Sequence, residues 1–253
     1  MDDLSALSQW KQAMTRLRAL FDEHGGEAYR QVANYSQRYQ GRRAEMVFDV
    51  VASRGRGSDL PVTEAFARTP AASSLRALAE QGAGTHSLRH HLDQGERRGS
   101  SYMGDGLRSG EARTIQAVAS GLVRFATERD LDDDHATRAW AESAAAFERT
   151  PQLEPYVGLV KGIGPVHFAS MRMLSGADAL RPDSRVRASL NRLGFQVPSG
   201  KHGILIVAHA AAAELAVSRL ALDQLLWYSV GSSKRRSAPG DSVGGRQPGP
   251  AWV

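Results

Sequence analysis

The sequence contains no cysteine among its 253 residues. This absence excludes disulfide bonds, zinc sites with cysteine ligands and iron–sulfur clusters held by cysteine. Long apolar runs are also missing, and neither a bilayer-spanning segment nor a charged-then-apolar leader is evident. We therefore expect a cytoplasmic protein without a membrane partner.

Aromatic residues make up only 7% of the chain and do not alternate with basic residues. This argues against the stacking platforms that bind single-stranded nucleic acid. Serine and histidine show no nucleophile-elbow pattern. The Gly162-Ile163-Gly164 segment lacks both the third glycine of a dinucleotide fingerprint and the Lys-Ser/Thr of a P-loop. Nucleotide hydrolysis is therefore not expected.

The clearest cluster of candidate metal ligands is formed by His86, His90 and His91. One pair has the i, i+4 spacing that could hold a metal on a helix, but no carboxylate with matching spacing completes the site. We therefore predict that the protein has no metal site.

Helical periodicity dominates the chain, and strand-like alternation is scarce. Apolar residues recur every three or four positions in two segments, at Trp10, Met14, Leu17 and Phe21 and again from Ile115 to Ala126. The pattern predicts an all-α protein with one domain over residues 1–230.

The expected boundaries follow from glycine, proline and acidic residues. The first helix is expected to end at Gly25-Gly26, and the second to run from about Glu27 to Ser53 with a weak point at Gly41. Two segments rich in Gly, Ser and Pro predict loops at 54–74 and 94–110. Asp130 to Asp134 indicates a helix junction, and residues 231–253 are expected to form a disordered tail.

The most informative segment is Leu159-Val160-Lys161-Gly162-Ile163-Gly164-Pro165, with Asp183 nineteen residues after Gly164. A tight Gly-Ile-Gly turn between helical stretches exposes backbone N–H groups to a phosphate, and an acid shortly downstream can reach the sugar beside it. This pairing indicates chemistry on DNA.

Positive charge is concentrated around this turn. Residues 161–201 hold seven basic residues against two acidic ones, a net charge of +5, so the other 212 residues net zero. Such a field favours a polyanion ligand, whereas the alternative interpretation is a solvated helix face.

The turn, followed by a helix through Phe168, Met171 and Leu174, resembles the helix-hairpin-helix motif. The segment from Asp183 to Gly194 looks like the aspartate region of the helix-hairpin-helix DNA glycosylase superfamily. The resemblance implies a two-lobed helical bundle of the 8-oxoguanine glycosylase type, with the hairpin at about 154–175 and a DNA-binding cleft between the lobes. It also implies that Asp183 is the catalytic acid. The alternative role for Asp183 is a helix N-cap.

Two further resemblances follow the family order. Leu107 and Arg108, in Gly106-Leu107-Arg108-Ser109-Gly110, match the position of a wedge that fills the gap left by a flipped base. Gln224, Trp227 and Tyr228 match the last helix, where a glutamine and an aromatic contact the base. Ordinary packing stays open for Leu107, Gln224 and Tyr228.

The resemblance also predicts the DNA contacts. Hairpin N–H groups would bind phosphates and fix register without reading sequence. The expected DNA-binding residues are Lys161, Gly162, Gly164, Val166, His167, Arg185 and Arg187.

One departure from the family changes the expected reaction. Members that also cut the strand carry a lysine two residues after the second hairpin glycine, and here that residue is Val166. Neither Lys161 nor His167 inherits the nucleophile's role by position. We therefore expect a monofunctional DNA N-glycosylase without cofactor, apart from a monovalent cation that the resemblance allows at the hairpin turn.

The expected function is hydrolytic excision of a modified or damaged base in base excision repair, by base flipping and with Asp183 stabilising the oxocarbenium-like sugar. Its partner would be double-stranded DNA, which the protein would bind as a monomer. In a prokaryote the protein would be associated with the nucleoid. The base stays open among 8-oxoguanine, alkylated purines and modified phage bases. The alternatives are a non-catalytic helix-hairpin-helix DNA-binding protein and a helical scaffold whose basic face is incidental.

Overall fold

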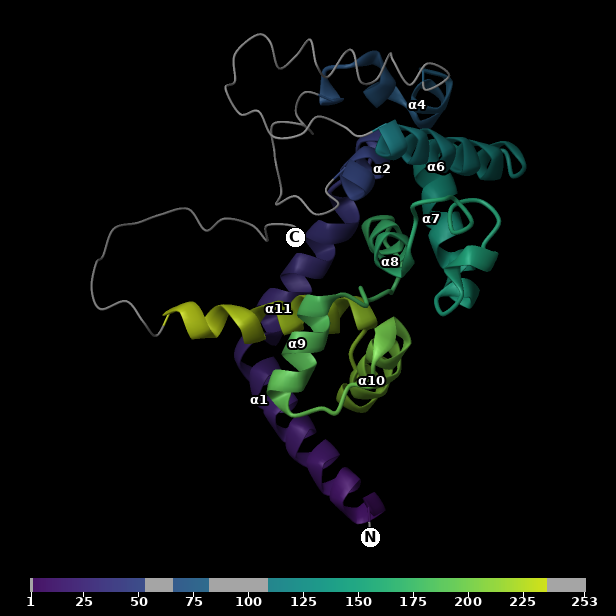
Figure 1. Cartoon of the computed structure of the whole chain (residues 1–253). Coiled ribbons are helices and arrows are strands. Elements are labelled where there is room, and N and C mark those ends of the chain that lie inside the picture. Colours follow the sequence, from purple (N-terminus) through teal and green to yellow (C-terminus); the bar gives the residue numbers. More distant parts are fainter. Residues whose placement is uncertain (1, 53–65, 82–108, 236–253) are drawn as a thin grey trace, which may run out of the picture. The chain divides into compact units, whose positions relative to one another are not determined.

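The computed structural model describes residues 2–52, 66–81 and 109–235 (Figure 1). Within these ranges the regular structure consists of helices and contains no strand, which confirms the all-α prediction. The chain divides into two compact units. We call residues 2–37 with 177–235 the terminal unit and residues 38–176 the central unit, and describe each by itself.

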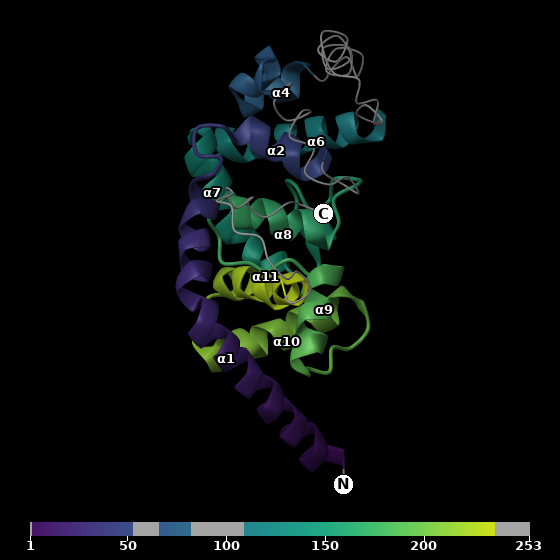
Figure 2. The same ribbon diagram turned by 90° about the vertical axis from the view of Figure 1, so that its left-hand side faces the viewer.

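The terminal unit is built on α1 (Asp2–Gln37), which packs against three C-terminal helices. These are α9 (Ser184–Leu193), α10 (Gly200–Leu215) and α11 (Arg219–Arg235). Figures 1 and 2 both show α11 lying against α1. The predicted apolar stripe of α1 supplies part of the core, since Met14 and Leu17 are fully buried there.

The expected helix end at Gly25-Gly26 is wrong, because α1 continues through both glycines to Gln37. The absence of a side chain at Gly25 lets the Phe21 ring pack closely against the helix, because a Cβ at Gly25 would lie 2.9 Å from that ring. Each glycine costs a helix roughly 0.5–1 kcal/mol, which packing against α11 offsets. The break comes instead at Gly41, whose φ of 70° lies in the left-handed region.

The central unit has α6 (Ser109–Thr127) at its middle. Ile115, Val118 and Leu122 of its predicted stripe are fully buried. This helix packs against α2 (Arg43–Ala52), α4 (Leu75–Gln81) and α7 (Asp133–Ser143), and α8 (Pro165–Leu174) packs against α2 and α7. The described part of this unit also contains short 3₁₀ helices at Pro70–Ser73, Ala144–Phe147 and Pro151–Leu153.

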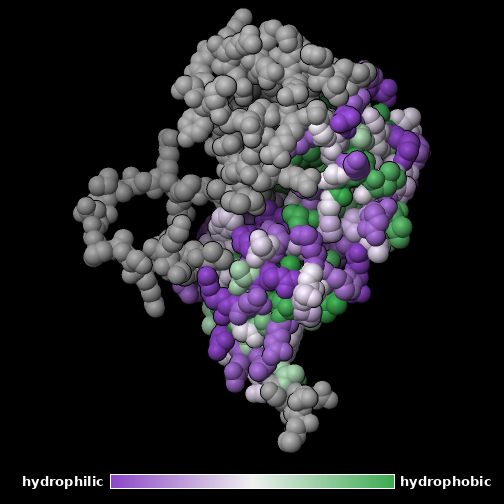
Figure 3. All heavy atoms as spheres, in the orientation of Figure 1, coloured by the Kyte–Doolittle hydropathy of each residue, from purple (hydrophilic) through white to green (hydrophobic). Residues whose placement is uncertain are grey.

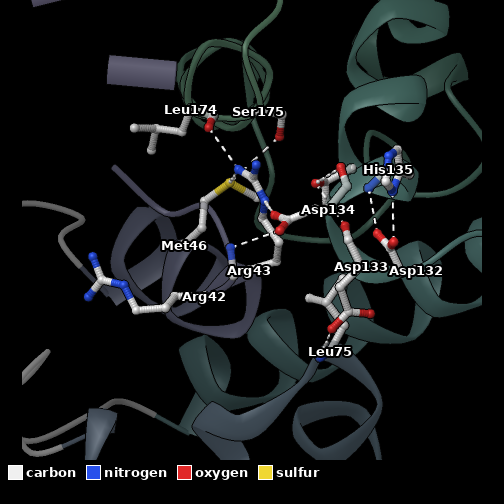
Figure 4. Close-up of polar contacts among 12 residues, drawn as sticks. Arg42, Arg43, Met46, Leu75, Asp132, Asp133, Asp134, His135, Leu174 and Ser175 are labelled. Atoms are coloured by element: carbon white, nitrogen blue, oxygen red, sulfur yellow. Dashed lines mark hydrogen bonds and ion pairs between the residues drawn. The ribbon is translucent and has the colours of Figure 1, made fainter. Parts of the chain in front are cut away.

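The helix junction predicted at Asp130 to Asp134 is present, and its carboxylates satisfy backbone N–H groups (Figure 4). Asp132 caps its own helix by accepting a hydrogen bond from the His135 N–H at 2.8 Å. Asp133 accepts one from the Leu75 N–H at the start of α4, also at 2.8 Å. The junction therefore fixes the starts of α7 and α4.

Asp134 connects the same junction to the start of α2. It accepts a hydrogen bond from the Gly41 N–H at 2.8 Å and pairs with the buried Arg43 side chain. Arg43 also donates to the Leu174 carbonyl oxygen at 3.0 Å (Figure 4). One buried arginine thus joins the start of α2 to α7 and to the end of α8.

Several predicted boundaries differ from the structure. Helix α11 runs to Arg235, past the boundary expected at residue 230, and the rest of the expected tail lies outside the described residues. A 3₁₀ helix lies within the expected loop 54–74, and α6 begins at Ser109, inside the expected loop 94–110.

No single described helix is long and apolar enough to cross a membrane. The pair Gly200–Leu215 and Arg219–Ser229 passes that test only together, and it is bent by 101°. Buried residues of both helices belong to the core of the terminal unit. On the face shown in Figure 3, hydrophobic residues are scattered among hydrophilic ones over the described surface.

Candidate functional site

The hairpin segment, residues 151–164, leads into α8 in the central unit. A helix follows the turn as expected, since α8 begins at Pro165 after Gly164. The stretch before the turn differs from the α-helix expected there. It consists of the 3₁₀ helix Pro151–Leu153 followed by hydrogen-bonded turns.

Glu154 explains this local structure. Its carboxylate is buried, with 2% of the residue exposed, and accepts hydrogen bonds from three successive N–H groups. These come from Tyr156 at 3.1 Å and from Val157 and Gly158 at 2.7 Å each. A side chain that satisfies three neighbouring N–H groups competes with an α-helical pattern, so the backbone stays in a compact turn.

Close backbone contacts fix the hairpin segment on α6. A Cβ on Gly121 would lie 1.9 Å from the Tyr156 carbonyl oxygen, and one on Gly158 would lie 1.9 Å from that of Pro151. Arg124 of α6 adds a cation–π contact, 4.8 Å from the centre of the Tyr156 ring. Both glycines are therefore required by close approach, and the segment is rigidly supported.

The turn itself needs its first glycine. Gly162 has a φ of 100°, and a Cβ there would lie 2.7 Å from Thr114 Oγ1. The Thr114 hydroxyl donates to the Lys161 carbonyl oxygen at 2.9 Å, which anchors the turn to α6. Gly164 differs, because a Cβ there would meet no atom within 4 Å. The space beside Gly164 is open, as a phosphate approaching the backbone requires.

The first turn of α8 follows this open space. Gly164 is its N-cap, no side chain caps the helix, and Pro165 carries no N–H. The first N–H groups of the helix therefore belong to Val166 and His167. Amides at a helix N-terminus, together with the helix dipole, favour an anion.

Asp183 lies in the terminal unit, at the N-cap of α9. Its Oδ1 accepts a hydrogen bond from the Val186 N–H at 2.8 Å. The side chain is 16% exposed. The capping role weighed from the sequence is thus present, and it leaves Oδ2 for other contacts.

A buried acid beside this cap was missed by the sequence analysis. Asp223 of α11 is fully buried and accepts hydrogen bonds from the Arg181 backbone and side chain at 3.2 Å each. Arg185 and Gln224 also donate to it, at 3.4 and 3.1 Å. Burial opposes ionisation of Asp223, but Arg181 and Arg185 outweigh it and hold its pKa below the usual value.

Burial and neighbouring charges also have opposite effects on the pKa of Arg181. Burial lowers the pKa of this guanidinium, but Tyr35, Asp223 and Asp183 outweigh the loss of water, and the net shift is upward. Arg181 therefore remains charged, and the Arg181–Asp223 pair is a buried ion pair.

Arg185 connects Asp223 to Asp183. Its Nε lies 4.0 Å from Asp183 Oδ2, and its guanidinium lies over the Trp227 ring, 4.6 Å from the ring centre. Four residues that the sequence suggested separately, Asp183, Arg185, Gln224 and Trp227, therefore belong to one contact network through Asp223.

The predicted base-reading residues have partners inside the terminal unit. Gln224 is buried against Asp223, and Tyr228 stacks on His24 of α1 with ring centres 4.9 Å apart. Burial and then the Glu27 carboxylate raise the pKa of the Tyr228 phenol. The packing alternative is thus realised for both side chains.

Most of the basic run is also used internally. Arg187 donates to the carbonyl oxygens of Val197 at 3.1 Å, Pro198 at 2.8 Å and Gly200. Arg172, Arg181, Arg185, Arg192 and Lys201 likewise have carbonyl or carboxylate partners. Lys161 is exposed in the hairpin segment. Of these internal partners, only the carboxylates of Glu148 and Asp223 offset the charge of the run, because a carbonyl partner leaves a cation charged. The internal bonds of Arg185 and Arg187 occupy some of their N–H groups and limit how these side chains can turn toward a phosphate.

Some predictions fall on residues that the structure does not describe. The wedge candidates Leu107 and Arg108 lie outside the described residues, as do His86, His90 and His91. Within the described part of the chain, no group of three or more His, Asp or Glu side chains could hold a metal ion.

The sequence did contain a signal for one of the missed residues. Asp223 is an acid within the apolar run Leu220 to Leu226, and an isolated charge in such a run needs a buried partner. Thr114 and Glu154 gave no comparable signal, because their partners are backbone groups. Comparison with protein-family models, with curated proteins and with solved structures finds no match for this chain.

Proposed function

We propose that this chain is a monofunctional DNA glycosylase, which flips a modified base out of double-stranded DNA, hydrolyses its N-glycosidic bond and leaves an abasic site. The observation that carries the proposal is the turn from Gly162 to Gly164. It combines a left-handed glycine, open space at Gly164 and an uncapped helix start.

The hairpin segment is the proposed phosphate contact. The N–H groups at the start of α8 bind a phosphate, and Lys161 adds charge from an exposed position. The support from α6 suits this role, because a rigid turn loses little freedom when DNA binds. In this proposal the central and terminal units are the two lobes expected from the sequence.

Asp183 is the proposed catalytic residue. Departure of the base gives the deoxyribose oxocarbenium character, and the Asp183 carboxylate stabilises that charge and orients or deprotonates water. Fixing the carboxylate by its own helix cap is compatible with this role, because the cap uses only one oxygen.

The absence of an amine at Val166 favours hydrolysis over strand cleavage. Leu107 or Arg108 is proposed to fill the gap left by the flipped base. Of the three base-pocket candidates, Trp227 at the Arg185 contact is the one proposed to face the base, since Gln224 and Tyr228 are engaged elsewhere.

The test is incubation with duplexes that each contain one modified base, including 8-oxoguanine, alkylated purines and modified pyrimidines. Strand breaks after alkali, but not before it, are expected with at least one duplex. Breaks without alkali would contradict the monofunctional reaction.

Asp183→Asn is the decisive variant, because asparagine caps a helix about as well as aspartate. We expect a loss of excision of at least about a hundredfold with little change in DNA affinity. Asp132→Asn is the matched control. Asp132 is also an N-cap that accepts a hydrogen bond at 2.8 Å, and the variant is expected to keep full activity.

One observation favours the non-catalytic alternative, a helix-hairpin-helix DNA-binding protein. The Asp183 carboxylate already has a structural use as a cap. In that case the chain would bind duplex DNA with a steep salt dependence, leave every modified base intact and treat Asp183→Asn and Asp132→Asn alike.

A further inference from the structure

The contacts around Asp183 form a network with a definite order within the terminal unit. Asp183 Oδ1 is held by the Val186 N–H at 2.8 Å, and Oδ2 faces Arg185 Nε at 4.0 Å. Arg185 in turn reaches Asp223 Oδ2 at 3.4 Å and lies over the Trp227 ring. Oδ1 of Asp183 is thus held by a hydrogen bond, and Oδ2 has a cation at ion-pair distance that favours one orientation of the carboxylate.

Arg185 suits the middle of this network for a geometric reason. A guanidinium is planar, so it can lie on an aromatic face while its edge directs N–H groups at two carboxylates. The Trp227 face and Asp223 fix the plane of Arg185. Its Nε then meets Asp183 from a set direction.

Asp223 does more than connect two segments. Asp178 already joins the segment before α9 to α11, since it accepts hydrogen bonds from the Leu220 N–H at 2.9 Å and from Arg219 at 3.2 Å. Asp178 is 46% exposed, whereas Asp223 is fully buried, where an ionised carboxylate is least favourable. Two arginines and an amide surround Asp223, and one of those arginines reaches Asp183.

We propose that Asp223, Arg185 and Trp227 are positioning residues for Asp183. The buried carboxylate and the indole ring fix the Arg185 guanidinium, which holds the free oxygen of Asp183 in one orientation toward the sugar. This assigns Arg185 a role in the reaction rather than in phosphate binding, and it gives Trp227 a positioning role in addition to the base contact proposed above. The inference rests on the proposed glycosylase function.

The experiment measures single-turnover excision at saturating DNA, together with the Kd for the same duplex. Arg185→Gln is expected to slow excision by about a hundredfold, because a misdirected carboxylate loses the advantage of orientation. Its Kd is expected to stay near that of the wild type. Arg185→Lys keeps the charge without the planar fork and should recover only part of the rate.

Asp223→Asn should slow excision in the same direction, and its thermal unfolding is followed to confirm that it folds. Asp178→Asn is the matched control, because Asp178 also pairs with an arginine and an N–H of α11 but has no contact with Asp183. The inference would be overturned if the Arg185→Gln variant excised the base no more slowly than this control. A loss confined to Kd would also overturn it, since Arg185 would then be a phosphate contact.

A second readout does not depend on excision. The rate of hydrogen exchange at the Val186 amide reports whether this amide stays bonded to Asp183. The rate in Arg185→Gln should be several-fold higher than in Asp178→Asn. A wild-type chain that excises no base contradicts the proposed function, while amide exchange still tests the network. An active chain in which Arg185→Gln changes neither rate nor exchange contradicts the network alone.

Discussion

The hairpin segment is held by backbone groups at close range, whereas the surroundings of Asp183 are held by buried charge. Gly121 and Gly158 allow carbonyl oxygens to lie where a Cβ would otherwise be. Asp223 and its two arginines instead form an ionic cluster around a fully buried carboxylate. The first region should be sensitive to added volume, and the second to lost charge.

This difference suits the two tasks proposed for these regions. A turn proposed to bind phosphate needs an open backbone in a fixed shape, and the close glycine contacts provide that shape. A carboxylate that meets a developing positive charge needs a fixed orientation, and directed ion pairs provide that. The comparison can be tested one region at a time.

The largest expected effect comes from volume in the hairpin segment. Gly158→Ala should lower the free energy of unfolding by about 3 kcal/mol or more, because its Cβ would lie 1.9 Å from the backbone carbonyl oxygen of Pro151. Urea unfolding of the full chain measures this. Gly26→Ala is the control, since a Cβ there meets nothing within 4 Å and should stabilise α1 by roughly 0.5–1 kcal/mol. Equal effects of the two variants would contradict the account.

The second largest effect on stability is expected from the loss of a charge in the terminal unit. Asp223→Asn is expected to cost about 3 kcal/mol at neutral pH, because it leaves the buried Arg181, and the partly exposed Arg185, with a neutral partner. Asp178→Asn, at an exposed pair, should cost at most about 1 kcal/mol. Chemical unfolding of both variants makes the comparison.

The same pair has a defined pH dependence. The pKa of Asp223 is lowered in the folded chain, so its contribution to stability is complete above its ordinary value of about 3.9 and is lost as pH falls through the lower folded value. The stability difference between wild type and Asp223→Asn should therefore shrink only in strong acid. A difference that disappears nearer neutrality would contradict the ionised, paired state.

A smaller change in stability is expected at the open side of the turn. Gly164→Ala should alter unfolding by less than about 0.5 kcal/mol, because its backbone is extended and its Cβ meets no atom. It should nevertheless weaken duplex binding by about tenfold, since the methyl group occupies the path of the phosphate. Fluorescence anisotropy with labelled duplex measures this. Unchanged affinity would show that the turn does not contact DNA at Gly164.

The smallest effect is expected at Tyr228. Its raised pKa means that ionisation should begin only above the ordinary value of about 10, and that its stabilising contribution is lost as pH rises beyond it. Ultraviolet titration of tyrosinate in wild type and Tyr228→Phe isolates this group. A transition near or below pH 10 would show that Tyr228 is less enclosed than its stacking on His24 indicates.

Periodicity predicted the fold well where one helix face is buried. The stripes on α1 and α6 became core, and the acidic junction before α7 is a helix cap. Prediction failed at Gly25-Gly26, because packing along α1 outweighs the intrinsic preference of two glycines. It also failed before the hairpin turn, because Glu154 satisfies backbone groups in a way that no periodic pattern records.

The candidate site was predicted in part for similar reasons. Gly162 and Asp183 were identified because turn geometry and helix starts have local sequence signals. The arginines were counted as surface charge, since charge counting does not reveal that Arg187 is bonded to three carbonyl groups. Asp223 depends on contacts between distant parts of the chain, which a single sequence does not show.

The central claim is that the turn binds DNA and Asp183 breaks the bond. Single-turnover excision and Kd, measured side by side for Gly164→Ala and Asp183→Asn, test it most directly. The account predicts opposite losses: Gly164→Ala keeps its excision rate at saturating DNA but loses affinity, and Asp183→Asn keeps affinity but loses excision. If both variants lose the same quantity, or if Asp183→Asn excises as fast as wild type, the assignment of the two regions is wrong.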